Sequence, residues 1–452
     1  MRRKAKLTWV LILVLIASSA YTAFTLLPSR SKGSEQGGNA WRAWAEVAWR
    51  YYTPGIGVDP QSLLHRANTQ WHWFTDWDLG SYIQSLIDAD KLDIIKTEPS
   101  FGKRVEAILG FLERRDLSRN GFPYWSYSTY TGEPDKEAGE TNPADIGHLL
   151  LALSTLRAYR PELASRINKI VDRHNMSRVL ERMGLEGGFY GYYAAQGFKA
   201  FGFDGNKAVN RSLGEMTRLS KGPHVSIYGE QIPRAWITSE PILHTLLELP
   251  NLNDDLFQEY ALRTYKVQEL RFRETSNYTA FTEGCYFAYG NYIFEWIIRG
   301  DNGATWTIVS FDQGKAQTLN IPAVIYTKAA FAYHALFTSE YTHKLVDWLL
   351  SRKEITTPSG FTEGVSEANE LVSYTTDKTN AMILSAARHA IERTTNPSEE
   401  SFAKRAHPST MATVRTAISS VSLPLPSKLR APPNISDALA APNPTPTSKS
   451  QQ

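Results

Sequence analysis

The segment Trp71-His-Trp-Phe-Thr-Asp-Trp-Asp-Leu-Gly-Ser-Tyr-Ile-Gln-Ser-Leu-Ile87 joins an aromatic, acidic stretch to an amphipathic helix. Its first half carries three tryptophans and two aspartates, a high density of such side chains directly ahead of a helix. Its second half repeats apolar residues at the spacing of one helix face, namely Leu79, Tyr82, Ile83, Leu86 and Ile87. The segment therefore predicts a helix whose N-terminal end presents aromatic and acidic groups.

The same helical spacing recurs along most of the chain. Apolar stripes predict helices over 101–112, 143–156 and 161–171, and the last two open on a proline, which suits a first helical turn. Further helices are predicted over 241–249, 255–270, 328–337, 341–350 and 377–391. One region departs from this period. Residues 291–299 and 305–311 are rich in Ile, Trp, Phe and Val and have the two-residue alternation of strands. Asp301-Asn-Gly303 lies between them, so the region predicts a β-hairpin.

Paired helices whose connecting loops alternate between short and long are typical of an α/α toroid. We expect a mainly α protein, an α/α toroid of six helical hairpins with a small β-hairpin insertion, over residues 41–393. The loops at one end of the inner helices would form a funnel. The long loops are the aromatic and acidic ones, predicted at 71–78, 120–130, 187–193, 279–292 and 360–369.

The two ends of the chain differ from this pattern. Residues 7–27 are uncharged and mostly apolar behind a basic start, and as a helix they would span roughly 31 Å, enough for a bilayer core. We expect residues 1–30 to be a membrane anchor, with a cleaved signal peptide as the alternative. A linker is expected at 31–40, and a disordered tail rich in Pro, Ser, Thr and Ala at 394–452. The domain would lie in the cell envelope on the periplasmic or extracellular side, or be secreted.

Composition excludes several classes of function. The formal net charge is +3, but five basic residues lie in the first 30 positions, so the remainder has no basic excess for binding nucleic acid. Cys285 is the only cysteine, which rules out an intramolecular disulfide and a cysteine-based metal cluster. The histidines lack zinc-binding spacing, and no phosphate-binding glycine loop is present. We therefore expect neither a metal nor another cofactor.

The tetrapeptide Phe-Thr-Glu-Gly occurs twice, at 281–284 and 361–364, and supplies the first candidate catalytic groups. Glycoside cleavage needs two carboxyl groups, one to protonate the leaving oxygen and one to act as base or nucleophile. Glu283 is our candidate general acid, because aromatic neighbours would desolvate it and raise its pKa. Glu363 is a candidate second carboxylate, and Glu367 lies close enough in sequence to contact substrate. Capping or ion pairing within each loop is the structural alternative.

Asp78 is the other candidate for the second carboxylate, although a capping role at the helix start would explain it equally well. Asp145 falls in the first turn of a predicted helix and could bind substrate or stabilise the helix dipole. The remaining candidates are aromatic side chains that could stack on sugar rings, namely Trp73, Trp77, Tyr190 and Tyr193.

Six short motifs in register resemble one known family over about residues 41–393. The motifs are Thr75-Asp-Trp-Asp-Leu-Gly-Ser, Asp145-Ile-Gly-His-Leu-Leu, Tyr193-Ala-Ala-Gln-Gly-Phe, Thr238-Ser-Glu-Pro, Thr327-Lys-Ala-Ala-Phe-Ala-Tyr-His-Ala-Leu-Phe and Thr379-Asn-Ala-Met-Ile-Leu. They resemble the bacterial domain-of-unknown-function family 3131 (DUF3131), which is similar to glucoamylase-like α/α toroids. The resemblance implies an envelope protein acting on a glycan. Members usually carry an acid in the glycine-rich tyrosine segment, just before the paired alanines. Here that segment reads Gly188-Phe-Tyr-Gly-Tyr-Tyr-Ala-Ala195, with glycine or tyrosine in place of the acid.

Three functions follow as hypotheses. The first is a glycoside hydrolase or transglycosylase acting on an envelope or extracellular polysaccharide. The second is a polysaccharide lyase that uses the stretch containing Asn210, Arg211, His224, Tyr228 and Arg234. The third is a non-catalytic glycan-binding or scaffold protein of an envelope machine, with the C-terminal tail contacting a protein partner. The altered tyrosine segment favours the third hypothesis.

Overall fold

The computed structural model describes residues 34–286, 291–312 and 315–395. The predicted anchor at 7–27 and the predicted tail, apart from its first two residues, lie outside this part of the chain. Within the described residues, no helix is long and apolar enough to cross a membrane.

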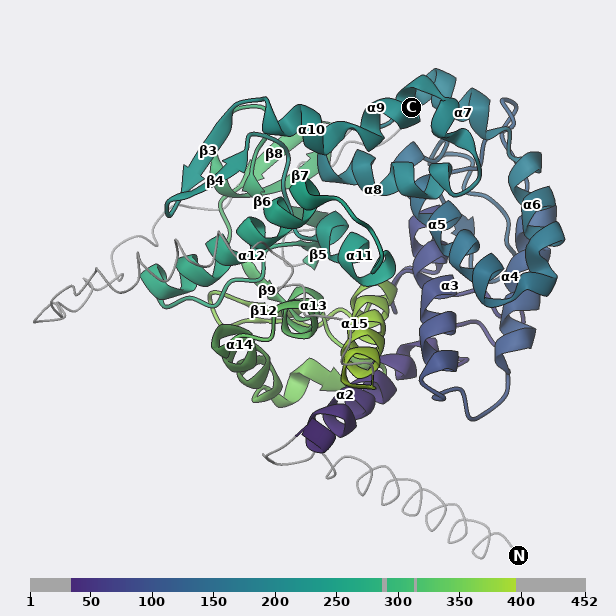
Figure 1. The fold of residues 1–452 in the computed structure, drawn as a ribbon. Helices are drawn as coiled ribbons and strands as arrows, with labels where there is room; N and C mark the ends of the chain where they lie inside the picture. The colour runs from purple at the N-terminus through teal and green to yellow at the C-terminus, as the bar shows by residue number, and fades with distance from the viewer. Residues whose placement is uncertain (1–33, 287–290, 313–314, 396–452) are drawn as a thin grey trace, which may run out of the picture. The chain divides into compact units, whose positions relative to one another are not determined.

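Six helices of the described part contact one another in a closed cycle (Figure 1). In chain order, each of the six packs against the next member of the set, and the last contacts the first. These inner helices are α3 (Asp76–Lys91), α5 (Pro143–Tyr159), α8 (Gly188–Lys199), α11 (Glu240–Glu248), α13 (Thr327–Phe337) and α15 (Asp377–Thr395).

The other helices lie around this ring (Figure 1). Most of them follow an inner helix in the chain. The outer helix nearest the N-terminus instead packs against α15, so the two ends of the described part lie together. These outer helices are α2 (Ser34–Trp49), α4 (Phe101–Arg114), α6 (Ala164–Arg173), α7 (Met176–Met183), α9 (Lys207–Leu213), α10 (Glu215–Ser220), α12 (Asp255–Thr275) and α14 (Glu340–Leu350).

Apolar patterning explains which helices are inner and which are outer. Every residue of α3 from Asp76 to Ala89 is buried, and α5 buries almost its whole circumference. Outer α6, in contrast, buries only Ile167, Ile170 and Val171. A helix that is apolar on all sides is stable only when it is covered on all sides, whereas a single stripe suits a surface position. The mainly helical class predicted from the sequence is confirmed.

Short strands occupy the connections between helices. The predicted hairpin is confirmed, since 291–298 and 305–312 pair antiparallel, but it belongs to a four-stranded sheet in the order β5-β6-β7-β8. The remaining strands form small antiparallel pairs or triplets. The strands of the described residues are β1 (Trp73–Phe74), β2 (Tyr127–Ser128), β3 (His224–Ile227), β4 (Glu230–Pro233), β5 (Glu283–Tyr286), β6 (Asn291–Ile298), β7 (Thr305–Asp312), β8 (Lys315–Leu319), β9 (Val324–Tyr326), β10 (Thr356–Thr357), β11 (Gly360–Phe361), β12 (Gly364–Ser366) and β13 (Leu371–Val372).

Two local predictions differ from the structure. Helix α2 begins at Ser34, inside the segment expected to be a linker, because Trp41, Ala45 and neighbouring residues of this helix are buried against the ring. The predicted loop at 187–193 is wrong, because inner helix α8 begins at Gly188. Packing outweighs the weak helix propensity of glycine there, since most of the aromatic and alanine side chains of α8 are buried.

Candidate active site

The inner helices bring polar side chains together at their N-terminal ends. Each of the six carries one in its first turn, and contacts between neighbouring helices show that these ends lie on the same side of the ring. We call this group of side chains the ring mouth. Its members on the helices are Asp78 on α3, Asp145 on α5, Tyr190 on α8, Glu240 on α11, Lys328 on α13 and Lys378 on α15.

Asp78 is fully buried and holds two elements together. Its Oδ2 accepts hydrogen bonds from the backbone and side chain of Thr75, which is the N-cap of α3, so the two residues form a capping box. Its Oδ1 lies 2.5 Å from the Nζ of Lys378. Burial acts to raise the pKa of Asp78, but Lys378 outweighs it and holds that pKa below its usual range. Asp78 therefore fixes α3 against α15.

Glu283 enters the ring mouth from strand β5, with 5% of its surface exposed. Its carboxyl group accepts hydrogen bonds from the Tyr190 hydroxyl and, at 2.8 Å, from the Tyr292 hydroxyl. Burial and the nearby negative charge of Glu240 raise the pKa of Glu283 to about 7, against the opposing effect of Lys328. A carboxyl group with this pKa can carry a proton at neutral pH and release it during a reaction.

Glu240 and Lys328 form a buried ion pair beside Glu283. The Lys328 Nζ lies 2.8 Å from the Glu240 carboxylate, and both side chains are fully buried. Thr282 donates a further hydrogen bond to Glu240 over 2.7 Å. Burial opposes ionisation of Glu240, but Lys328 holds its pKa well below the usual range. Glu240 thus keeps a fixed negative charge that disfavours a second one on Glu283.

Glu363, from the second Phe-Thr-Glu-Gly segment, reaches the neighbourhood of the first one. A Cβ added to Gly284 would lie 2.4 Å from Glu363 Oε2, so only glycine fits at that position without a shift. Oε1 accepts a hydrogen bond from Thr376, whereas Oε2 makes none with the described residues. Burial raises the pKa of Glu363 to about 6, although Lys328 opposes the shift.

Asp145 is the half-buried carboxyl group of the mouth. Burial and the charge of Asp78 raise the pKa of Asp145 to about 8. Its backbone N–H donates to the side chain of Asn142, the N-cap of α5. A protonated carboxyl group here can donate a hydrogen bond to a hydroxyl group of a ligand.

Aromatic side chains line the interior beside these groups. The ring of Trp77 lies 5.9 Å from that of Tyr190 and 5.8 Å from that of Tyr193. Tyr190 is half-buried, whereas Trp77 and Tyr193 are buried. Tyr193 donates to Glu248 over 2.6 Å, so its hydroxyl group has an internal partner. Tyr190 also has an internal partner, Glu283, but it is the most exposed of the three and so the best placed to meet a ligand.

A second aromatic group lies beside the start of α3. Trp73 lies on β1, where it pairs with Ser128 of β2. The rings of Trp71 and Trp125 are 5.6 Å apart, and Trp125 is 38% exposed. Tyr130 is 51% exposed and lies against His72. These exposed rings offer flat apolar faces on the same side of the ring as the mouth.

Some predicted site residues are engaged elsewhere. Glu367 forms an ion pair with Arg271 at 2.6 Å. The residues considered for a lyase lie outside the ring. Asn210 and Arg211 are on outer helix α9, and His224 is on β3. Among the described residues, the Glu283 carboxyl group has Tyr190 and Tyr292 as hydrogen-bond partners and none of this set.

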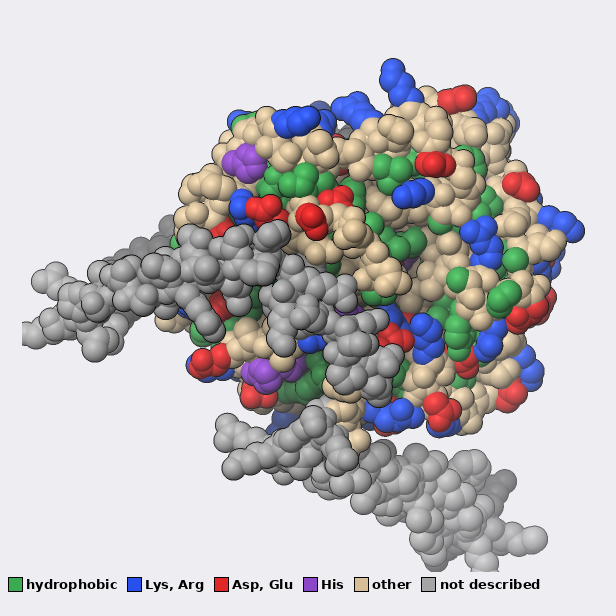
Figure 2. Space-filling view, in the orientation of Figure 1, with side chains coloured by type: hydrophobic (Ala, Val, Ile, Leu, Met, Phe, Trp, Pro, Cys, Tyr) green, Lys and Arg blue, Asp and Glu red, His purple; other side chains and the backbone are tan. Residues whose placement is uncertain are grey.

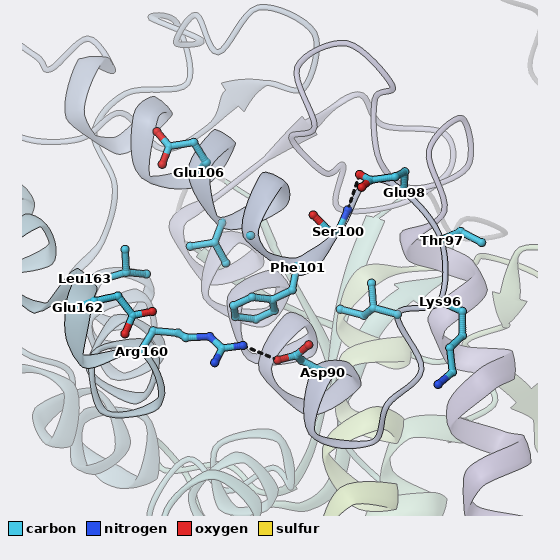
Figure 3. Close-up of a pocket in the computed structure, with 13 residues that line it drawn as sticks. Asp90, Lys96, Thr97, Glu98, Ser100, Phe101, Glu106, Arg160, Glu162 and Leu163 are labelled. Carbon is cyan, nitrogen blue, oxygen red and sulfur yellow. Dashed lines mark hydrogen bonds and ion pairs between the residues drawn. The ribbon is translucent and has the colours of Figure 1, made fainter.

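A surface pocket lies at the opposite end of the ring. It has a volume of about 500 Å³ and is lined by Asp90 of α3, by the loop from Ile95 to Ser100, by the start of α4 and by residues that directly follow α5. There Asp90 and Arg160 form an ion pair at 2.8 Å (Figure 3). On the face shown in Figure 2, acidic and basic side chains are interspersed. The pocket contains none of the ring-mouth residues. We place the candidate active site at the mouth, because carboxyl groups with raised pKa values gather there.

Three residues of the mouth were not proposed from the sequence. Glu240 and Lys328 lie within the motifs Thr238-Ser-Glu-Pro and Thr327-Lys-Ala-Ala, which already carried the family resemblance. Lys378 directly follows Asp377 at the predicted start of a helix. The sequence therefore contained these residues within recognisable motifs. It could not show that the lysines are buried, because that depends on which carboxylates they pair with in the fold.

Comparison with known proteins identifies the family. The family described as "Protein of unknown function (DUF3131)" matches residues 43–392 of the 452-residue chain. The chain belongs to the DUF3131 family. No curated protein matches the sequence of this DUF3131 chain.

Solved structures share the fold of the DUF3131 chain at low sequence identity. An endo-β-1,2-glucanase from Chitinophaga pinensis, in complex with sophorotriose and glucose, has a TM-score of 0.60 at 15% identity, over 81% of this chain and 94% of that chain. A glucoamylase-like protein from Bacteroides caccae has a TM-score of 0.58 at 14% identity, over 85% and 98%. An endo-β-1,2-glucanase from Talaromyces funiculosus, in complex with β-1,2-glucan, has a TM-score of 0.55 at 10% identity, over 86% and 92%. At these low identities, the TM-scores establish a shared fold alone.

Proposed function

We propose that this chain is a glycoside hydrolase or transglycosylase that cleaves a glucan at the ring mouth, within an α/α toroid of six helical hairpins. The observation that carries the proposal is the Glu283 carboxyl group, whose pKa is raised to about 7 between two tyrosine hydroxyls. β-1,2-Linked glucan is the first substrate to test, because it is the ligand of a protein with the same fold.

Glu283 would act as the general acid. Its carboxyl group gives its proton to the glycosidic oxygen as the bond from that oxygen to the anomeric carbon breaks. The fixed charge of Glu240 favours the protonated form before the reaction. The hydroxyl groups of Tyr190 and Tyr292 then stabilise the carboxylate that remains.

Glu363 would be the second carboxylate. It could take a proton from a water molecule that attacks the anomeric carbon, or attack that carbon itself. Glu363 suits either role better than Asp78, because Glu363 Oε2 has no described partner whereas both oxygens of Asp78 are occupied. Asp145, Trp77 and Tyr190 would hold the sugar, and Trp125 would extend the aromatic surface outward.

One observation favours a second candidate function, a glycan-binding protein without turnover. Glu283 is only 5% exposed and Glu363 only 1%, whereas Asp145 and Tyr190 are more accessible. A sugar held by the accessible groups could remain out of reach of both glutamates. The absence of an acid from the segment 188–195, where family members usually carry one, supports the same alternative.

The deciding experiment is a reducing-end assay of the full-length chain against β-1,2-glucan and a panel of neutral and uronate-containing envelope polysaccharides. New reducing ends from one polymer would establish hydrolysis and identify the substrate. Binding by calorimetry without new ends would favour the glycan-binding protein. A product that absorbs in the ultraviolet through a new double bond would instead indicate a lyase.

We also propose that the domain lies in the cell envelope, held there by residues 7–27 or secreted after their removal. The proposal rests on the apolar composition of this segment, which follows six N-terminal positions that include four basic residues. The C-terminal tail would then be available to an envelope protein partner. Fractionation of cells that produce the full-length chain, with and without residues 7–27, tests the location, and recovery of both forms in the cytoplasm would refute it.

A further inference from the structure

A second polar cluster lies one helical turn deeper in the ring than the mouth. His148 follows Asp145 by three residues on α5, and His244 follows Glu240 by four residues on α11. Glu248 is one further turn along α11. One ligand atom from each of His148, His244 and Glu248 can be chosen so that all three lie within 4.8 Å of one another.

His148 is the unusual member of this cluster. It is fully buried, and neither ring nitrogen has a hydrogen-bond partner among the described residues. Its ring packs on Trp77 at 4.5 Å and over Gly80, where a Cβ would lie 2.3 Å from His148 Cδ2. Leaving a buried polar group unpaired costs about 1–3 kcal/mol. The helix packing thus makes room for an imidazole without giving it a partner.

His244 and Glu248 supply the other two groups. His244 Nδ1 lies 2.6 Å from Glu248 Oε1, and each side chain is 4% exposed. His244 Nε2 has no hydrogen-bond partner in the described part of the chain, although Glu240 Oε1 lies 3.6 Å away. The Tyr193 hydroxyl donates to the second oxygen of Glu248 over 2.6 Å and fixes the carboxylate.

We propose that His148, His244 and Glu248 bind one divalent transition-metal ion, with zinc as the best match to these donors. Two imidazoles and one carboxylate form a known three-ligand set for zinc, with bonds of about 2.0–2.2 Å. The ion takes the place of the proton that His244 and Glu248 share, and it gives His148 the partner that it lacks. The donor atoms lie within 4.8 Å of one another, so binding requires the side chains to rotate toward the ion.

The position of the site between inner helices lets the ion stabilise their packing, while three protein ligands leave its fourth position to a water molecule. The ion joins α5 to α11 across α8, and Tyr193 of α8 supports the carboxylate ligand as an outer partner. Metal binding would therefore stabilise the packing of three inner helices. This inference is independent of the proposed hydrolase activity, because it holds equally for a glycan-binding protein.

The test uses the full-length chain, freed of metal by a chelator and then dialysed against Co²⁺, whose visible absorption reports on its ligands. We expect one Co²⁺ per chain, displaced by Zn²⁺, and a higher melting temperature with either ion. His148→Asn and Glu248→Gln should each weaken binding by more than about 100-fold, since each removes a ligand. The matched control is His174→Asn, which removes a buried histidine paired with Arg115 outside the cluster.

Less than one tightly bound ion per chain, or equal binding by wild type and His148→Asn, would overturn the proposal. Circular dichroism of each variant shows whether it folds. If the ligand variants do not fold, X-ray absorption of the zinc-loaded wild-type protein still decides the question. Two imidazoles in the zinc coordination sphere would support the site, and any other number would overturn it.

Discussion

The two Phe-Thr-Glu-Gly segments have the same four residues but different surroundings. Glu283 accepts hydrogen bonds from two tyrosines and lies near the fixed charge of Glu240. Glu363 accepts one from Thr376 and keeps its second oxygen free of described partners. The pKa of the first is raised to about 7 and that of the second to about 6. Identical local sequence thus gives two carboxyl groups with different protonation near neutral pH.

The difference shows that neighbours from distant parts of the chain set the chemistry of each segment. Tyr190 belongs to α8 and Glu240 to α11, whereas Thr376 directly precedes α15. A pair of carboxyl groups whose pKa values differ suits acid and base roles in one reaction. Activity is then expected to be highest between about pH 6 and 7. It falls at lower pH as Glu363 gains a proton and at higher pH as Glu283 loses one.

The largest effect is expected from removing either carboxyl group. Glu283→Gln and Glu363→Gln should each lower kcat/KM on the responsive glucan by about 10²–10⁴-fold, the usual contribution of a general acid or base. The measurement is the initial rate of reducing-end formation. Glu370→Gln, which changes an exposed carboxylate beyond the second segment, serves as control. A wild-type rate in Glu363→Gln would show that this glutamate is structural.

A smaller effect is expected from the threonines of the two segments, which are both buried. The Thr282 hydroxyl donates to the charged Glu240 over 2.7 Å, whereas that of Thr362 lies 3.4 Å from the Ile355 carbonyl. Thr282→Val should lower the free energy of unfolding by about 1.5–3 kcal/mol and Thr362→Val by about 0.5–1.5 kcal/mol. Urea denaturation measures both values. Equal losses of stability, or a larger loss for Thr362→Val, would contradict the conclusion that the Thr282 hydrogen bond is the stronger of the two.

The smallest effect is expected from the tyrosine beside Glu283. Tyr190→Phe removes a donor that stabilises the carboxylate, so the pKa of Glu283 should rise by about one unit. Because the acid must be protonated to act, the alkaline limb of the kcat/KM profile moves to higher pH. Tyr192→Phe on the same helix, whose hydroxyl donates to Asp254, should leave that limb in place. A shift to lower pH in Tyr190→Phe would refute the role of this hydrogen bond.

Helix positions could be predicted from the sequence because inner and outer helices bury regular apolar patterns. The stripe from Leu79 to Ile87 and the proline at 143 both mark helices that the structure contains. Inner helix α8 was mistaken for a loop, because its glycines and tyrosines give no periodic stripe. Its helical form depends on packing against α5 and α11, which local sequence does not encode.

The candidate site could be predicted only in part. The sequence could propose Glu283 and Glu363 because their segments repeat and contain aromatics. The sequence could not decide between Asp78 and Glu363 as the second carboxylate. The choice depends on the ion pair of Asp78 with Lys378, which lies 300 positions away in sequence. The spacing of His244 and Glu248 by one helical turn was visible, but His148 completes the cluster only in the folded chain.

The most direct test of Glu283 as the general acid measures how fast the Glu283→Gln variant cleaves two substrates that differ in their leaving group. A general acid is needed for a poor leaving group, such as a sugar hydroxyl, but not for fluoride, which leaves without a proton. We predict that Glu283→Gln loses nearly all activity on the glucan polymer yet cleaves the corresponding oligoglucosyl fluoride at close to the wild-type rate. Equal losses on both substrates would contradict the assignment of Glu283 as the acid.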